Sequence, residues 1–140
     1  MSLLELRHVS KAYNEKVLAL DDVNLKVEKG EWLAVMGPSG SGKSTLMNII
    51  GCMDSATGGE VILDGEVLTD ATPEELTRYR RDKIGIVFQQ FHMIPYLTAV
   101  ENIMVAQYYH SMPDRDEAMA ALERVGLADR ASHLPSQLSG

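Results

Sequence analysis

Residues 37–44 read Gly-Pro-Ser-Gly-Ser-Gly-Lys-Ser, which is the pattern G-x-x-x-x-G-K-S of a phosphate-binding loop. The residues before the loop, 32–36, form an apolar run of the length of a buried β-strand. The residues after it, 45–50, place apolar side chains where a helix packed on that strand would need them. A loop between a strand and a helix is the setting in which this pattern binds phosphate. The sequence therefore predicts a nucleotide-binding site.

The residue types in the loop suit a triphosphate. Glycines at positions 37, 40 and 42 let the backbone turn tightly and bring its N–H groups onto phosphate oxygens. A helix that opens near Gly42 adds unpaired N–H groups and the positive end of its dipole. In this pattern Lys43 reaches the β- and γ-phosphates, and the hydroxyl of Ser44 ligates Mg²⁺. A nucleoside triphosphate with Mg²⁺ is the predicted ligand.

Composition places the chain among soluble globular proteins. Its 140 residues, 45% of them hydrophobic and 24% charged, make one small domain or a piece of a larger protein. The formal net charge of −7 disfavours non-specific binding of nucleic acid. There is no apolar run of about eighteen residues and no signal-peptide layout. We expect any link to a membrane to go through a partner.

Alternation of apolar and polar residues predicts two strands ahead of the apolar run at 32–36. A two-residue turn at Asp64 and Gly65 predicts a hairpin of type I′, and residues 84–88 read as a further buried strand. In the first strand Leu4, Leu6 and His8 alternate with Glu5 and Arg7, and in the second Val23, Leu25 and Val27 alternate with Asn24 and Lys26.

Two helices are predicted from their first turns. Thr72 with Glu75, and Thr98 with Glu101, form capping boxes in which each side chain accepts a backbone hydrogen bond at the other's position. A third helix is predicted over residues 115–125 from its apolar spacing, with Gly126 as its stop.

Three further stretches resemble motifs of ATP-binding cassette (ABC) ATPases. Residues 84–90, Ile-Gly-Ile-Val-Phe-Gln-Gln, resemble the Q-loop, and residues 10–13, Ser-Lys-Ala-Tyr, resemble the A-loop. Residues 138–140, Leu-Ser-Gly, resemble the opening of the L-S-G-G-Q signature. The resemblance covers the whole chain and is greatest for the lipoprotein-release and macrolide-export branch.

The resemblance implies roles for matching residues. Tyr13 would stack on the adenine of ATP, with Val17 beside it, and Gln89 would meet Mg²⁺ and the attacking water. Lys43 and Gln89 are the expected catalytic residues, and Ser44 and Gln89 the expected Mg²⁺ ligands. The residues expected to bind ATP are Tyr13, Gly37, Ser39, Gly40, Ser41, Gly42, Lys43, Ser44, Thr45, Ser139 and Gly140.

The resemblance also implies a fold and partners. The expected fold is α/β: an antiparallel β subdomain, a parallel-sheet core with the phosphate loop, and an inserted helical subdomain. Residues 1–90 would form the nucleotide-binding core with the β subdomain, and residues 91–140 the helical subdomain. Expected partners are a second ATPase subunit in a head-to-tail homodimer, with Ser139 and Gly140 acting across it, and a transmembrane permease. The expected location is cytoplasmic, on the membrane through that permease, with no nucleic acid bound.

The sequence departs from the family pattern in one respect. Family members continue into the rest of the signature, a Walker B strand ending in Asp-Glu, a D-loop and a switch histidine, none of which occurs in these 140 residues. Phosphoryl transfer depends on the positioning and charge that these residues supply. We therefore expect the complete protein to be an ATPase, and this chain alone to bind ATP but to hydrolyse it poorly.

Three alternatives stay open. A non-transport cassette ATPase, such as a DNA-repair or chromosome-structure head domain, often carries a long coiled coil between the Q-loop and the signature. Here that stretch is short and has no heptads, and the chain is acidic. A GTPase or nucleotide kinase is a second alternative, but no guanine-reading N-K-x-D is present. The third is a binding role toward the membrane subunit without chemistry.

Overall fold

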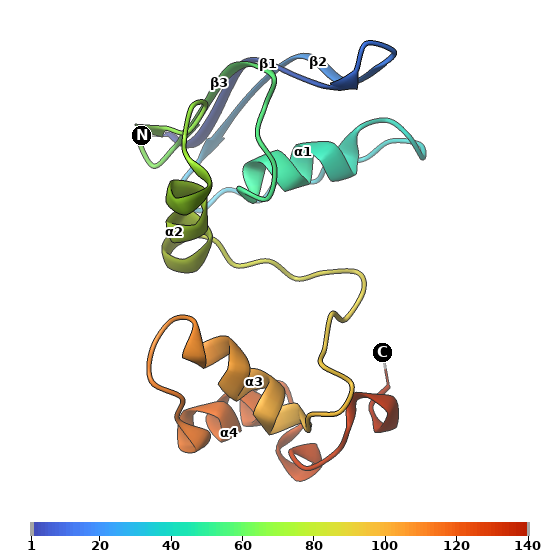
Figure 1. Ribbon diagram of the computed structural model, residues 1–140, viewed down its shortest axis with the longest axis vertical. Helices are drawn as coiled ribbons and strands as arrows, with labels where there is room; N and C mark the ends of the chain where they lie inside the picture. Colours follow the sequence, from blue (N-terminus) through green and yellow to red (C-terminus); the bar gives the residue numbers. More distant parts are fainter. Residues whose placement is uncertain (1, 140) are drawn as a thin grey trace. The chain divides into compact units, whose positions relative to one another are not determined.

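The structure, a computed structural model, describes residues 2–139 and divides into two compact units, one ending at Ile86 and the other beginning at Val87 (Figure 1). The first unit contains a sheet and two helices, and the second is helical.

The sheet of the first unit is antiparallel, with the strand order β2-β1-β3-β4. Its strands are β1 (Ser2–Asn14), β2 (Val17–Glu28), β3 (Gly58–Leu63) and β4 (Glu66–Val67). Helix α1 (Lys43–Ile50) packs on one face of the sheet, where Leu46 and Ile49 join the buried core with Leu6 and Val61 (Figure 1). The two strands predicted at the start of the chain are confirmed.

The β1 strand contains a bulge at His8. His8 (φ 51°) and Asp22 (φ 50°) of β2 both adopt positive φ, and the pairing of the two strands shifts between Leu6 and Val9. The extra residue moves the alternation by one place, so Val9 is fully buried and His8 is exposed. The simple alternation that the sequence shows from Leu4 to His8 is therefore interrupted at His8. The Nδ1 atom of His8 lies 2.6 Å from Oδ1 of Asp22.

The β-turn and the two helix N-caps that the sequence predicts are present in the structure. Asp64 (φ 51°) and Gly65 (φ 83°) both have positive φ, as a type I′ turn between β3 and β4 requires. Helix α2 (Pro73–Lys83) begins with the capping box of Thr72 and Glu75. Helix α3 (Ala99–Tyr108), in the second unit, begins with the matching box at Thr98.

The two apolar runs expected to be parallel strands, residues 32–36 and 84–88, form no strand. Trp32 is 98% exposed and Val87 is fully exposed. An isolated extended segment leaves its backbone N–H and C=O groups without ladder partners, and the four-stranded sheet pairs with neither run. The strand assignment is therefore wrong for both segments, because apolar character alone does not supply a neighbouring strand.

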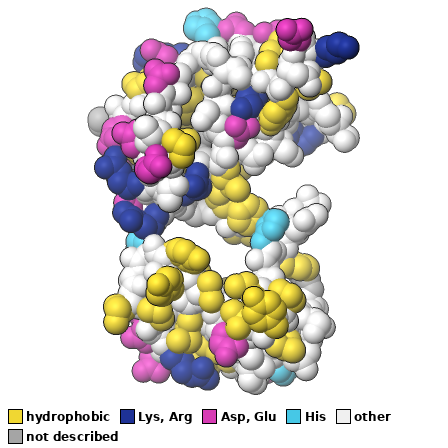
Figure 2. Space-filling model, viewed as in Figure 1, with side chains coloured by type: hydrophobic (Ala, Val, Ile, Leu, Met, Phe, Trp, Pro, Cys, Tyr) yellow, Lys and Arg dark blue, Asp and Glu magenta, His cyan; other side chains and the backbone are white. Residues whose placement is uncertain are grey.

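The second unit packs α3 against α4 (Arg115–Arg124), with short 3₁₀ turns η1 (Ala128–Arg130) and η2 (Pro135–Gln137) after them. The backbone N–H groups of Ala99 and Val100, at the start of α3, donate to the carbonyls of His133 and Ala131. Figure 2 shows hydrophobic side chains gathered on the visible face of this unit. No helix among residues 2–139 is both long and apolar enough to cross a bilayer. The core of the unit is formed by Ala99, Val100, Ala118, Leu122 and Ala131.

Candidate nucleotide-binding site

The phosphate loop of the first unit leads directly into α1. Gly42 is the N-cap, with φ 90°, and Lys43 is the first helical residue. A Cβ on Gly42 would lie 2.5 Å from the backbone oxygen of Ala19, so both its conformation and its surroundings require glycine. Gly40 also has positive φ (80°), and a Cβ there would meet nothing within 4 Å. The loop is thus bent by glycines and open at Gly40, as a cradle for an anion requires.

Lys43 folds back over the loop that precedes it. Its Nζ donates to the carbonyl oxygens of Gly37 (2.7 Å) and Pro38 (2.8 Å) and lies 3.3 Å from Oγ of Ser41. These bonds bring a positive charge to the loop, beside the first N–H groups of α1, which have no partners within a helix. An ammonium ion and free N–H groups in one place form an anion-binding arrangement.

A cavity of about 310 Å³ opens at this point, between the loop, the start of α1 and β2. Loop and helix contribute polar groups, and the beginning of β2 contributes an apolar wall. No carboxylate lies among the described residues that line it. A lining that combines hydrogen-bond donors with apolar side chains fits a phosphate group joined to an uncharged base. The lining residues are Val17, Leu18, Ala19, Ser39, Gly40, Gly42, Lys43, Ser44 and Thr45.

Tyr13, near the end of β1, is held close to the start of α1. Its hydroxyl lies 3.3 Å from Oγ1 of Thr45 and donates to Oδ2 of Asp54 over 3.5 Å. Its side chain is 53% exposed, so the ring keeps an accessible surface. The structure therefore brings Tyr13 to the same helix turn as the phosphate loop, although the two are far apart in the sequence.

The remaining predicted site residues belong to the second unit. Gln89 is exposed in a segment without regular structure, next to Phe88, whose ring makes an edge contact with that of His92. Ser139 is exposed as well. Gly140 lies outside the described residues. The roles of these three residues stay predictions.

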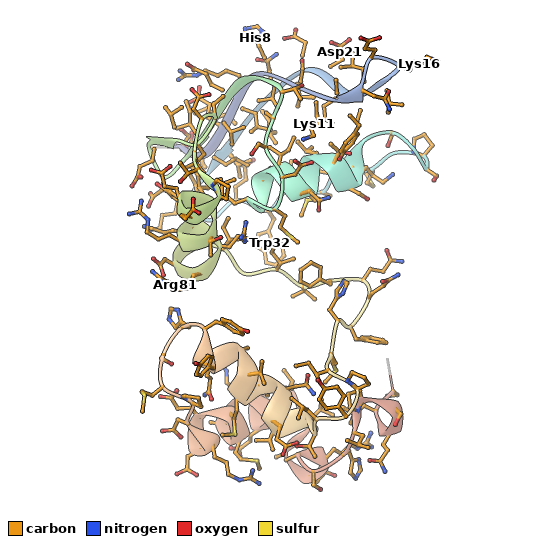
Figure 3. All side chains as sticks on the ribbon, viewed as in Figure 1. His8, Lys11, Lys16, Asp21, Trp32 and Arg81 are labelled. Atoms are coloured by element: carbon orange, nitrogen blue, oxygen red, sulfur yellow. The ribbon has the colours of Figure 1, made fainter. Side chains whose placement is uncertain are left out.

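Sequence reasoning missed two charged residues beside Tyr13. Lys11 is buried under the sheet, and its Nζ donates to Oδ1 of Asp54 (2.6 Å); Figure 3 shows Lys11 between the sheet and α1. Burial raises the pKa of Asp54, but hydrogen bonds from Lys11 and the Ser55 N–H outweigh it and leave that pKa below its ordinary value. The sequence could have indicated Lys11, because it lies two residues before Tyr13 and therefore on the same face of β1. Asp54 carried no signal.

Comparison with known proteins decides the family. The family profile described as ABC transporter matches residues 20–140. The chain belongs to this family. Over 148 residues it is 46% identical to the ABC transporter ATP-binding protein MJ0796 of Methanocaldococcus jannaschii, covering 99% of this chain and 63% of that protein. It is also 44% identical over 144 residues to the macrolide export ATP-binding/permease protein MacB of Burkholderia pseudomallei, covering 99% of this chain and 22% of that protein.

A solved structure of this ABC transporter family has the same fold. The dimeric post-hydrolysis state of MJ0796 bound to ADP and Pi matches with a TM-score of 0.87 and 44% identity, over 97% of this chain and 63% of that one. The predicted α/β fold class of an ABC ATPase cassette is confirmed, although the strands among residues 2–139 pair only in an antiparallel sheet, and the resemblance to the macrolide-export branch is confirmed as well. These relatives are transporter proteins, and they give no support to a DNA-repair or chromosome head domain. The chain spans 63% of the length of MJ0796.

Proposed function

We propose that this protein is the ATP-binding subunit of an ABC transporter, which couples ATP binding and hydrolysis to the export or extraction of a substrate through a membrane partner. The observation that carries the proposal is the phosphate loop, where the Lys43 ammonium and the start of α1 converge on one cavity. Two features there suit a polyphosphate: the Lys43 ammonium, and the free backbone N–H groups at the positive end of the α1 dipole.

In the proposed site, different residues bind the phosphates, the adenine and the Mg²⁺ of the ligand. The backbone of residues 40–45 and the Lys43 ammonium hold the phosphates, and the Tyr13 ring stacks on the adenine, with Val17 at the cavity wall. The Ser44 hydroxyl, exposed at the start of α1, and the Gln89 amide are the proposed Mg²⁺ ligands. Bound Mg²⁺ neutralises charge on the phosphates during their transfer. Gln89 would also orient the attacking water.

The proposed partners follow from the relatives. MJ0796 was solved as a dimer, which supports a homodimer of ATPase subunits, for which we propose a head-to-tail arrangement with Ser139 reaching the partner's nucleotide. MacB is named as an ATP-binding and permease protein, which supports a permease partner for this chain. We propose that the permease holds the protein on the cytoplasmic face of the membrane. The net charge of −7 supports the absence of a nucleic-acid partner.

Substituting Ser44 tests the metal site. Mg²⁺ is expected to raise the affinity of the wild type for ATP, and Ser44→Ala is expected to lower the affinity measured with Mg²⁺ by about tenfold, which removes most of that gain. The reason is that a metal ligand is lost while the Lys43 contacts remain. Ser44→Thr keeps a hydroxyl at this position and is expected to keep the gain. The measurement is calorimetric titration of ATP with Mg²⁺ and with EDTA. Ser111→Ala, an exposed serine of the second unit, is the control. An unchanged response of Ser44→Ala to Mg²⁺ would contradict the assignment.

A further inference from the structure

The side chain of Lys11 is buried, which is unusual for a lysine. Its side chain is only 10% exposed, on the inner side of β1. A buried ammonium ion is costly unless its hydrogen-bonding capacity is met. Two of its donors are met by Oδ1 of Asp54 (2.6 Å) and the carbonyl oxygen of Ser55 (2.7 Å). The ammonium also lies over the ring of Tyr13, 5.2 Å from its centroid, within the range of a cation–π contact.

Asp54 forms hydrogen bonds with both Lys11 and Tyr13. One carboxylate oxygen accepts from Lys11, and the other accepts from the Tyr13 hydroxyl at 3.5 Å. The same hydroxyl lies 3.3 Å from Oγ1 of Thr45, which is buried in the first turn of α1. The ring of Tyr13 is thus fixed at its hydroxyl and covered on one face by the ammonium, while the residue remains half exposed.

The segment that carries Asp54 is itself held between α1 and β1. The N–H of Asp54 donates to the carbonyl of Asn48, in the last turn of α1. Thr57 donates from its N–H and its hydroxyl to the carbonyl of Ser10, and its Oγ1 accepts from the N–H of Ala12. Asp54 therefore stands at a fixed place relative to both the helix that begins at the phosphate loop and the strand that carries Tyr13.

We propose that Lys11 and Asp54 are positioning residues for nucleotide recognition: together they hold the Tyr13 ring with one face covered and leave the other face for the base. The inference rests on the proposed function, in which Tyr13 stacks on adenine. It adds that the base half of the site depends on an ion pair that touches no part of the nucleotide.

The pair acts on base binding alone. Phosphate binding relies on the loop and Lys43, none of which bonds to Lys11 or Asp54. Loss of the ion pair frees the Tyr13 ring to adopt other rotamers, so stacking then costs side-chain entropy. Affinity for ATP is expected to fall, while affinity for inorganic tripolyphosphate, which has no base, is expected to stay the same.

The experiment compares binding of Mg-ATP and Mg-tripolyphosphate by calorimetry in the wild type, Lys11→Met, Tyr13→Ala and the double variant. Lys11→Met keeps the length of the side chain and removes its charge. We expect Lys11→Met to lower the affinity for ATP about fivefold or more and to change the affinity for tripolyphosphate by less than about twofold. In the Tyr13→Ala background, Lys11→Met is expected to cause no further loss, because its effect passes through the ring. Lys29→Met, an exposed lysine in the turn after β2, is the matched control.

Each outcome decides between the claims. An equal loss for both ligands, no loss for either, or full additivity in the double variant would overturn the positioning role and leave the proposed function standing. A wild type that binds neither ligand, or binding that survives Lys43→Ala, would overturn the proposed function and the inference with it. If circular dichroism shows that Lys11→Met is unfolded, Asp54→Asn takes its place, because it keeps the shape of the side chain. Asp54→Asn is likewise expected to lower the affinity for ATP and to leave the affinity for tripolyphosphate unchanged.

Discussion

Replacing Lys43 with alanine is expected to weaken ATP binding by about 100-fold or more, which is the loss of two charge-assisted hydrogen bonds in a partly enclosed site. The Lys43 ammonium is already drawn onto the loop by the carbonyls of Gly37 and Pro38. A phosphate in the cavity would meet a cation that already lies beside the loop, and the ammonium would exchange its bonds to these carbonyls for stronger bonds to phosphate oxygens. Its removal leaves only the backbone N–H groups and the helix dipole to hold the phosphates.

Calorimetric titration with Mg-ATP measures this effect. Lys29→Ala removes one positive charge from an exposed turn and serves as the control, since it alters the net charge equally. Because Lys43 is not among the residues of the buried core, the variant is expected to keep the circular dichroism spectrum of the wild type. ATP affinity equal to that of the control would show that the loop does not hold phosphate.

The largest effect on stability is expected from Gly59→Ala, which should lower the free energy of unfolding by about 3 kcal/mol. Gly59 lies in β3 with φ 84°, a conformation that a residue with a Cβ adopts at a cost. A Cβ there would lie 2.3 Å from the carbonyl oxygen of His8, which belongs to backbone and has little room to move. The substitution therefore strains β3 and pushes against the bulge of β1.

Its neighbour Gly58 provides a close control. A Cβ on Gly58 would meet nothing within 4 Å, so Gly58→Ala is expected to change stability by no more than about 0.5 kcal/mol. Urea unfolding followed by circular dichroism measures both variants. Equal stability of the two would mean that β3 does not approach β1 closely at Gly59.

The parts of the fold that sequence reasoning predicted are those governed by neighbours along the chain. The turn at Asp64 and Gly65 and the capping boxes at Thr72 and Thr98 each need only a few consecutive residues, and all three formed. The phosphate loop belongs to the same class, because its glycines, its lysine and the helix they precede are contiguous. For these elements, local backbone chemistry is sufficient.

The parts that were wrong or missed depend on residues far away in the chain. The bulge that exposes His8 forms together with Asp22 on the neighbouring strand, and nothing in the alternation of β1 marks it. Residues 32–36 have the composition of a strand, but pairing is a property of two segments rather than one. The contact of Lys11 with Asp54 spans 43 residues, so no local pattern could reveal it.

Trp32 gives the protein an optical reporter of its own. It is the single tryptophan of the sequence, and at 98% exposure its indole is surrounded by water. It lies five residues before Gly37, where the phosphate loop begins, so its emission reports on that segment without interference from any other indole. Packing of residues 32–36 against a neighbour would shift the emission to shorter wavelengths, and the same sample could be followed through a titration without any attached dye.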